Sequence, residues 1–189
     1  MKRVSLFCLT RGGLALARLL GEGLGGGELH LPERLAPEAS FPFGEVHPFR
    51  TLGEACREAF TRSSGLIFIM AAGIVVRSLA PLLKDKRREP GVVVVDEGGA
   101  YAISLLGGHR GGGNALAGRV ASLTGGRAVV TTGSEVRGTL ALDLLAERFG
   151  LTPEDSLALR RASMALVEGE KVAFWAEDEI APYLKKEIE

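Results

Sequence analysis

The stretch GVVVVDEGGAYAISLL, residues 91–106, predicts two neighbouring strands joined by a tight turn. Residues 91–96 contain four consecutive valines, a pattern typical of a strand buried on both faces of a sheet. Residues 101–106 form a second apolar run of similar length. The short spacing between the two runs favours a β-hairpin, so we expect these two strands to be antiparallel.

Strand-like and helix-like segments alternate on both sides of this hairpin. Further strands are predicted at residues 4–9, 28–31, 65–70, 127–132 and 171–175, and helices at residues 16–24, 51–62, 72–83, 114–123, 139–149 and 155–167. The alternation predicts an α/β fold, with a mostly parallel open sheet flanked by helices, one antiparallel hairpin and room for two small subdomains.

Three local signals refine this prediction. Thr51 and Glu54 have the spacing of a capping box at the start of a helix. Pro81 must shorten or kink the helix that contains it, because proline lacks the N–H group that the helix needs. Residues 32–48 hold four prolines and therefore predict a long irregular connection.

The composition excludes several classes of function. The chain of 189 residues has 23 Lys and Arg and 23 Asp and Glu residues, so it lacks the cationic excess that sequence-independent nucleic-acid binding requires. No apolar run approaches the roughly 20 residues that cross a bilayer. Cys8 and Cys56 lie far apart and the histidines show no metal-ligand spacing, so neither a disulfide framework nor a metal site is predicted. We expect a cytoplasmic protein with no nucleic-acid or membrane partner.

The amide content is unusual. The chain has no Gln and a single Asn, Asn114, and its 17 Arg outnumber its 6 Lys. Depletion of thermolabile amides favours a thermophilic source, although the base composition of a genome can produce the same bias.

Glycine is concentrated between residues 98 and 114, where it makes up 7 of 17 residues. The second half of this segment, residues 107–114, leaves a predicted strand and enters a predicted helix. Glycines let a ligand approach the backbone closely, and a helix N-terminus offers N–H donors to an anion. His109 can carry a proton near neutral pH, and Asn114 can both cap the helix and contact a ligand. The alternative is a flexible turn in which Asn114 is only an N-cap.

Two carboxylates follow the valine-rich strand. Asp96 and Glu97 lie where ligands gather in open α/β sheets, so either is a candidate base or a partner that orients His109. A solvated hairpin turn explains Glu97 equally well.

Cationic and hydroxyl side chains complete the set of candidates. A local group of cationic residues could bind an anionic small ligand. For two of its members, Arg87 and Arg88, a solvated surface position is the better interpretation. Thr131 and Thr132 offer two hydroxyls at a strand end, where they equally need no function. The cationic group consists of Arg77, Lys84, Lys86, Arg87 and Arg88.

Three segments in a fixed order resemble one known family. They are GIVVRSLAP (residues 73–81), EPGVVVVDEG (89–98) and ISLLGGHRGGGN (103–114), with Lys86 between the first two. They resemble the CbiG-type cobalamin-biosynthesis proteins, the cobalt-precorrin-5A hydrolases of the anaerobic pathway. The resemblance runs from about residue 65 to residue 132 and is looser elsewhere. Glu89 and Gly113 stand where the family usually has Asp and Ala.

The resemblance implies a reaction and a substrate. Family members open the δ-lactone of cobalt-precorrin-5A and release acetaldehyde, which gives cobalt-precorrin-5B. Lactone hydrolysis needs a base for water and donors for the oxyanion. We therefore expect His109 as base or proton shuttle, with Glu97 or Asp96 as its partner. No metal site or cofactor is expected of the protein, because the substrate carries its own cobalt. The residues expected to bind substrate are Arg77, Lys86, Gly108, Gly111, Gly112, Gly113, Asn114, Thr131 and Thr132.

The resemblance also divides the chain. It implies an N-terminal α/β segment (1–48), the glycine-rich core region of the family (49–135) and a helical or mixed region (136–189), with the family's C-terminal domain absent. Expected partners are the cobalt-corrinoid substrate, other cobalamin-pathway enzymes or a separate protein that carries the C-terminal domain, and a homodimer stays open. Two alternatives remain: a non-catalytic corrinoid-binding module that needs that domain, or an unrelated α/β enzyme for a phosphorylated ligand.

Overall fold

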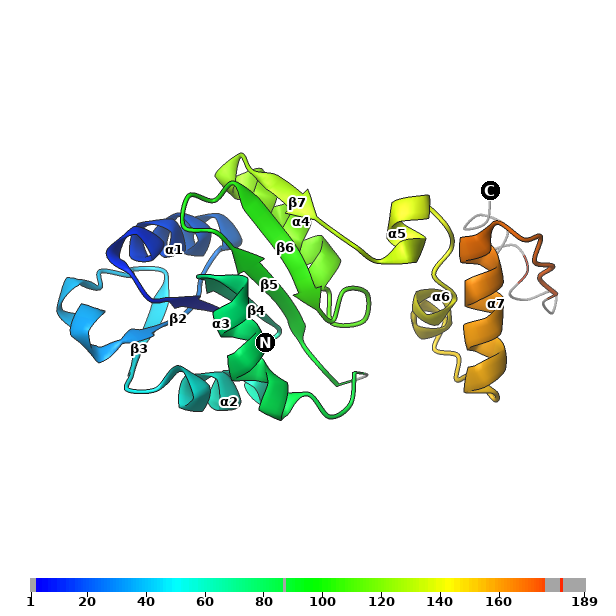
Figure 1. The fold of residues 1–189 in the computed structure, drawn as a ribbon, viewed down its shortest axis with the longest axis horizontal. Helices are drawn as coiled ribbons and strands as arrows, with labels where there is room; N and C mark the ends of the chain where they lie inside the picture. Colours follow the sequence, from blue (N-terminus) through cyan, green and yellow to red (C-terminus); the bar gives the residue numbers. More distant parts are fainter. Residues whose placement is uncertain (1–2, 87, 176–180, 182–189) are drawn as a thin grey trace. The chain divides into compact units, whose positions relative to one another are not determined.

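The computed structural model describes residues 3–86, 88–175 and 181, and the chain divides into two compact units, Met1–Val130 and Thr131–Glu189. The first unit is built on one seven-stranded sheet with the strand order β3-β2-β1-β4-β5-β6-β7 (Figure 1). Its strands are β1 (Val4–Cys8), β2 (Gly27–Pro32), β3 (Gly44–Phe49), β4 (Gly65–Ile69), β5 (Gly91–Val95), β6 (Tyr101–Leu106) and β7 (Arg127–Val129). Its helices are α1 (Arg11–Leu24), α2 (Leu52–Arg62), α3 (Ala72–Leu79) and α4 (Gly113–Thr124), with 3₁₀ turns η1 (Glu33–Glu38) and η2 (Ala80–Leu82).

All neighbouring strands are parallel except β5 and β6, which confirms the predicted α/β sheet with one antiparallel hairpin. The chain adds β2 and β3 on one side of β1 and then crosses to β4 on the other side. In doubly wound sheets, ligands bind where the strand order reverses in this way, outside the carboxyl ends of the strands. We call the side of the sheet where β1, β4 and β5 end the carboxyl edge, and the opposite side the amino edge.

Helices cover both faces of the sheet (Figure 1). On one face, α1 and α4 contribute Leu20 and Val120 to the core, and on the other face α2 and α3 contribute Cys56 and Leu79. Every residue of β4 and β5 is buried as a result, which explains the continuous valine run. The faces of the central strands β1, β4 and β5 are covered, so a ligand would approach these strands at their ends.

Residues 32–48 are more regular than the sequence predicted. They contain η1 and most of β3, which lies at one end of the sheet and pairs in parallel with β2. An edge strand tolerates Pro48 because one row of its N–H groups needs no partner within the sheet. The prolines therefore concealed a strand that they do not disrupt.

The two predicted helix signals have different outcomes. Pro81 ends α3, and the chain continues through it as the 3₁₀ turn η2, which confirms the prediction. Thr51 occupies the N-cap position of α2, but its Oγ1 donates to Glu54 Oε2 at 2.6 Å and makes no hydrogen bond to a backbone N–H. The two side chains pair with each other and do not form the reciprocal capping box.

The second unit contains α5 (Gly133–Arg137), α6 (Leu142–Arg148) and α7 (Ser156–Glu168). Asp155 caps α7, since its Oδ1 accepts from the N–H groups of Leu157 at 2.7 Å and Ala158 at 3.1 Å. The predicted strand at 171–175 is wrong, because these residues are irregular and no strand is described in this unit to pair with them. Nowhere in the described parts of the chain is a helix long and apolar enough to cross a bilayer.

Candidate functional site

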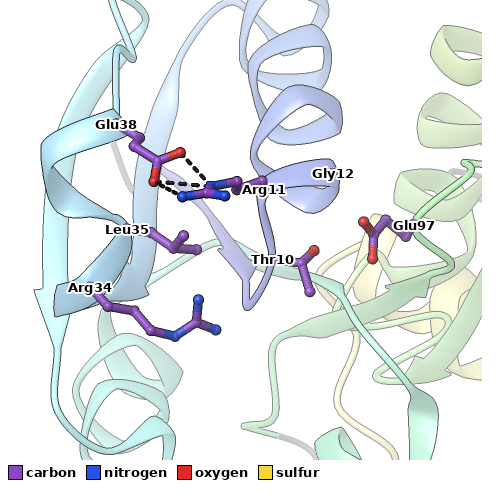
Figure 2. A pocket seen from close by; sticks show the side chains of 7 residues that line it. All are labelled: Thr10, Arg11, Gly12, Arg34, Leu35, Glu38 and Glu97. Atoms are coloured by element: carbon purple, nitrogen blue, oxygen red, sulfur yellow. Dashed lines mark hydrogen bonds and ion pairs between the residues drawn. The ribbon is translucent and has the colours of Figure 1, made fainter.

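A cleft of about 530 Å³ opens at the carboxyl edge of the sheet (Figure 2). Three segments form it: the turn between β1 and α1, the 3₁₀ turn η1 that follows β2, and the turn between β5 and β6. This is the position that the reversal of strand order predicts for a ligand. We call it the carboxyl-edge cleft, and its lining residues are Thr10, Arg11, Gly12, Arg34, Leu35, Glu38 and Glu97.

The turn between β1 and α1 presents the N-terminus of a helix to the cleft. Thr10 caps α1, because its Oγ1 accepts from the N–H of Gly13 at 3.0 Å. A helix of 14 residues carries partial positive charge at this end. Arg11 lies in the first turn and forms a bidentate ion pair with Glu38, with Nε–Oε2 and Nη2–Oε1 distances of 2.8 Å (Figure 2). The charge of Arg11 is therefore balanced within the cleft wall.

Arg34 supplies a second guanidinium to the cleft, from η1. Its Nη2 donates to the carbonyl oxygen of Leu9 at 2.6 Å, at the end of β1. This hydrogen-bond partner is neutral, whereas that of Arg11 is the Glu38 carboxylate, which also attracts Arg34 at longer range. Figure 2 shows Arg34 on the same side of the cleft as Leu35, reaching toward the turn that holds Thr10. Arg34 is thus placed to meet an anionic group of a ligand.

Asp96 fixes the turn between β5 and β6. Its Oδ1 accepts from the N–H of Tyr101 at 2.6 Å and its Oδ2 from the N–H of Gly98 at 3.1 Å. Burial raises the pKa of Asp96, but the N–H donors of Tyr101, Ala100 and Gly98 outweigh that effect and hold the pKa below its usual 3.8. The carboxylate therefore has a structural role in the turn, and Asp96 as a base stays a prediction.

Glu97 follows in the same turn and lies against the first turn of α1. A Cβ atom added to Gly12 would overlap the Oε1 atom of Glu97. The thiol of Cys8 lies nearby. Burial, and secondarily the charge of Glu97, raise the pKa of Cys8 to about 11. Cys8 is therefore protonated at neutral pH and unsuited as a nucleophile. Of the two predicted carboxylates, Glu97 is the one that lines the cleft.

The glycine loop, residues 107–113, lies at the amino edge. Because β6 runs antiparallel to β5, the end of β6 meets the beginning of β5, and a Cβ on Gly107 would come within 2.5 Å of the Pro90 carbonyl oxygen. The five residues of β5 span about 15 Å. His109 and Glu97 thus lie at opposite edges of the sheet, which contradicts the expectation that Glu97 or Asp96 orients His109.

The N–H groups at the end of this loop are used within the loop. Gly112 donates to the carbonyl of His109 at 3.0 Å, Gly113 to that of Gly107 at 3.0 Å, and Asn114 to that of Gly108 at 2.9 Å. The sequence predicts that such groups face an anionic ligand. In this conformation these three N–H groups stabilise the entry into α4 instead.

Close backbone contacts account for several of the glycines. A Cβ on Gly111 would lie 2.6 Å from the Gly91 nitrogen, and one on Gly113 would lie 2.6 Å from the Leu106 carbonyl oxygen. Gly112 has φ 75°, a left-handed conformation, and is the N-cap of α4. Glycine is needed here because segments of this chain approach one another.

Asn114 is buried inside the first turn of α4 and is not its N-cap. Its Oδ1 accepts from the hydroxyl of Ser104 at 2.8 Å, which joins α4 to β6. The single amide therefore has a structural partner. Asn114 as a substrate contact stays a prediction, as does His109, which is half-buried in the glycine loop.

The remaining predicted residues are dispersed. Arg77 folds back along α3, and its Nη1 donates to the Gly73 carbonyl at 2.8 Å, toward the carboxyl edge. Lys86 is exposed in the connection that leads to the beginning of β5, and Arg87 lies outside the described residues. Thr131 and Thr132 belong to the second unit, and both stay predictions as substrate contacts.

The sequence analysis missed most of the carboxyl-edge cleft. The predicted site rests on the glycine-rich segment 98–114, and the beginning of α1 is not among the predicted residues. The available signal was the sequence TRGG, residues 10–13, directly after the first predicted strand. The first strand-to-helix turn of an α/β sheet is a position where ligands bind. Arg34 and Glu38 were hidden in the proline-rich stretch.

His30 and His47, whose spacing in sequence indicates no shared site, stack on each other. His30 on β2 lies between Phe7, at 4.4 Å, and His47, at 4.9 Å between ring centroids. Burial, and secondarily the nearby His47, lower the pKa of His30 to about 4, against an opposing effect of Glu28. The described residues contain no group of three or more His, Cys, Asp or Glu side chains arranged to hold a metal ion.

Two family models match this chain. The one described as cobalamin synthesis G N-terminal matches residues 54–135, and the one described as cobalamin biosynthesis central region matches residues 140–188. A Salmonella typhimurium protein named cobalt-precorrin-5A hydrolase is 40% identical over 178 residues, which cover 94% of this chain and 49% of the relative. A Priestia megaterium protein of the same name is 42% identical over 114 residues, 60% of this chain and 30% of the relative. The chain thus spans about half the length of the first relative, and less of the second.

One solved structure supports the fold. A Sulfolobus solfataricus protein described as a homologue of cobalamin biosynthesis protein G aligns with a TM-score of 0.53 and 16% identity. The alignment covers 93% of this chain and 51% of that one. At this identity the likeness concerns the fold alone.

Proposed function

Given that the chain belongs to the CbiG family of cobalamin-biosynthesis proteins, we propose that it acts in the anaerobic pathway on cobalt-precorrin-5A. The proposed reaction opens the δ-lactone by hydrolysis and releases acetaldehyde, which gives cobalt-precorrin-5B. The observation that carries the proposal is the 40% identity over 178 residues with a relative named for this activity. Membership of the family sets aside an unrelated enzyme for a phosphorylated ligand.

The carboxyl-edge cleft is the proposed site. A cobalt-corrinoid is larger than about 530 Å³, so the cleft would receive the rim of the macrocycle that carries the lactone, with the rest outside. The substrate has several carboxylates. Arg34, whose described partner is a neutral carbonyl, is the proposed anchor for one of them. The N-terminus of α1 adds positive potential at the same place.

Glu97 is the proposed general base. It would take a proton from the water that attacks the lactone carbonyl, and the ring-opened product carries a carboxylate and a free hydroxyl group. Loss of the hydroxyl proton then lets the C–O⁻ group collapse to the carbonyl of acetaldehyde. The electrons of the broken carbon–carbon bond remain on the macrocycle, which takes up a proton. The sum is lactone plus water giving the acid plus acetaldehyde, and no oxidant is needed.

His109 remains a candidate for a proton shuttle, with one geometric restriction. At the amino edge it cannot act on the same reacting atom as Glu97, since the length of β5 separates the two edges. Comparison of Glu97 and His109 variants therefore decides which edge holds the reaction.

An anaerobic assay with purified chain and cobalt-precorrin-5A tests the proposal. Acetaldehyde would be measured through NADH oxidation by added alcohol dehydrogenase, and the corrinoid products by mass. One acetaldehyde for each lactone opened supports the proposal. A corrinoid that binds with a spectral change but yields no acetaldehyde would favour the non-catalytic binding module, and a chain that does neither would reject both.

A further inference from the structure

We infer that Gly12 is the positioning residue for Glu97: the missing side chain at position 12 makes the space in which the carboxylate of Glu97 is held. This inference rests on the proposed function in so far as Glu97 is the base. It concerns two residues 85 positions apart in sequence, on the β1–α1 turn and the β5–β6 turn. Neither the sequence motifs nor the comparisons assign a role to Gly12.

The backbone at position 12 does not itself require glycine. Gly12 is the second residue of α1, is exposed, and is absent from the glycines with positive φ. Alanine is preferred over glycine at such a helical position. The three atoms nearest to a Cβ at position 12 would nevertheless all belong to Glu97: Oε1, Cδ and Cγ. The space kept free by Gly12 is therefore occupied by one side chain.

The backbone of the β5–β6 turn, which carries Glu97, is also constrained. Asp96 accepts two backbone hydrogen bonds within the turn, and the N–H of Gly99 donates to the carbonyl of Asp96 at 2.9 Å. Gly99 has φ 72°, and a Cβ there would lie 3.1 Å from Thr124 on α4. The backbone of Glu97 is thus fixed by the turn, and its exposed side chain extends into the space that Gly12 leaves open on α1.

The position of the carboxylate matters for the proposed chemistry. The first turn of α1 attracts a negative charge, and the carboxyl-edge cleft lies between this turn and η1. A side chain at position 12 would push the carboxylate away from α1 without removing it. Displacement of a catalytic group by about 1 Å can cost about 100-fold in rate while substrate binding is preserved.

Gly53 provides a matched control. It is the second residue of α2, as Gly12 is of α1, and it is also exposed. A Cβ at Gly53 would meet nothing within 4 Å. Gly53→Ala therefore measures the effect of alanine at this helical position without any contact to Glu97.

The experiment uses Gly12→Ala, Glu97→Ala, their combination, and Gly53→Ala in both backgrounds. Gly53→Ala should raise Tm by about 2–4 °C whatever residue is at position 97. Gly12→Ala should not raise Tm while Glu97 is present. In the Glu97→Ala background, Gly12→Ala should raise Tm as much as Gly53→Ala does. In the acetaldehyde assay, Gly12→Ala should lower kcat about 10- to 100-fold with KM unchanged, and should have no further effect once Glu97 is alanine.

Two results would overturn the inference. One is that Gly12→Ala changes Tm by the same amount as Gly53→Ala, both with Glu97 and with alanine at position 97. The other is a kcat loss of the same size with and without Glu97. A wild-type chain that releases no acetaldehyde would reject the proposed function instead, and the Tm comparison would still decide whether Gly12 and Glu97 are coupled.

Discussion

The turn between β1 and α1 and the glycine loop between β6 and α4 both lead from a strand into a helix, at opposite edges of one sheet. In the glycine loop, Gly107, Gly111 and Gly113 lie against backbone atoms of their own chain. In the β1–α1 turn, Gly12 lies against a carboxylate, beside a cleft with a guanidinium from Arg34. The density of glycine alone therefore does not distinguish a ligand site from a close approach of backbone segments. What a Cβ atom would meet at each glycine distinguishes the two turns.

The largest expected difference between the two edges is in the effect on kcat of replacing Glu97 or His109. We expect Glu97→Gln, which keeps the size of the side chain, to lower kcat about 100- to 1,000-fold, as for loss of a general base. His109→Ala should lower kcat less than about threefold. Turnover with cobalt-precorrin-5A, measured as acetaldehyde, checks both variants. A large loss for His109→Ala with a small one for Glu97→Gln would move the reaction to the amino edge.

Alanine in the glycine loop should affect folding rather than ligand binding. Gly111→Ala would place a Cβ within 2.6–2.8 Å of three backbone atoms, so we expect it to lower the free energy of unfolding by about 3 kcal/mol. Gly118 is the control, because a Cβ there, within α4, meets nothing within 4 Å. Urea denaturation of both variants gives the values. A Gly111→Ala variant of wild-type stability that no longer bound corrinoid would restore the ligand role of this loop.

The buried His30, which lies in neither candidate site, should make the free energy of unfolding depend on pH. The pKa of His30 is about 4 in the folded chain and about 6.5 when unfolded, so protons bind more readily to the unfolded chain. Stability should be unaffected by His30 above pH 6.5 and should fall as the pH drops from 6.5 to 4, by about 2 kcal/mol at pH 5. His30→Phe, which keeps the ring stack with Phe7 and His47, should remove this dependence. Urea denaturation between pH 4 and pH 8 would show it, and equal slopes for both proteins would contradict it.

The smallest expected effect concerns substrate binding. Arg34→Gln should raise KM about tenfold and leave kcat nearly unchanged, because the guanidinium is proposed to bind a carboxylate remote from the reacting bond. Arg119→Gln is the control, since Arg119 is also exposed and donates to a backbone carbonyl, that of Gly23, outside the cleft. Steady-state kinetics of the two variants measure the effect. Equal KM values would exclude Arg34 as the anchor.

Much of the sheet was predictable, because hydrophobic patterns report burial directly. The valine run of β5 and the spacing to β6 predicted the hairpin, and the chain between Val4 and Val129 alternates as expected. The sequence does not predict β3 because its prolines indicate an irregular connection, although an edge strand accepts Pro48. The strand expected at residues 171–175 failed for the opposite reason, since an apolar run forms a strand only beside a partner.

The candidate site was less predictable because it depends on how distant segments meet. Sequence placed Glu97 at a strand end, where it lies, but could not show that the antiparallel β6 carries His109 to the other edge. The contact between Gly12 and Glu97 joins turns 85 residues apart and leaves no local signal. Arg34 lies in a 3₁₀ turn, which has little periodicity to recognise.

The location of bound corrinoid tests the central claim most directly. A corrinoid that carries paramagnetic cobalt(II) broadens the NMR signals of amides near it, so ¹⁵N-labelled chain can be titrated with it under anaerobic conditions. Substrate in the carboxyl-edge cleft should broaden the amide signals of Gly12, Gly13 and Gly98 and leave those of Gly111 and Gly113 sharp. Broadening confined to Gly111 and Gly113 would contradict the account and place the substrate at the amino edge.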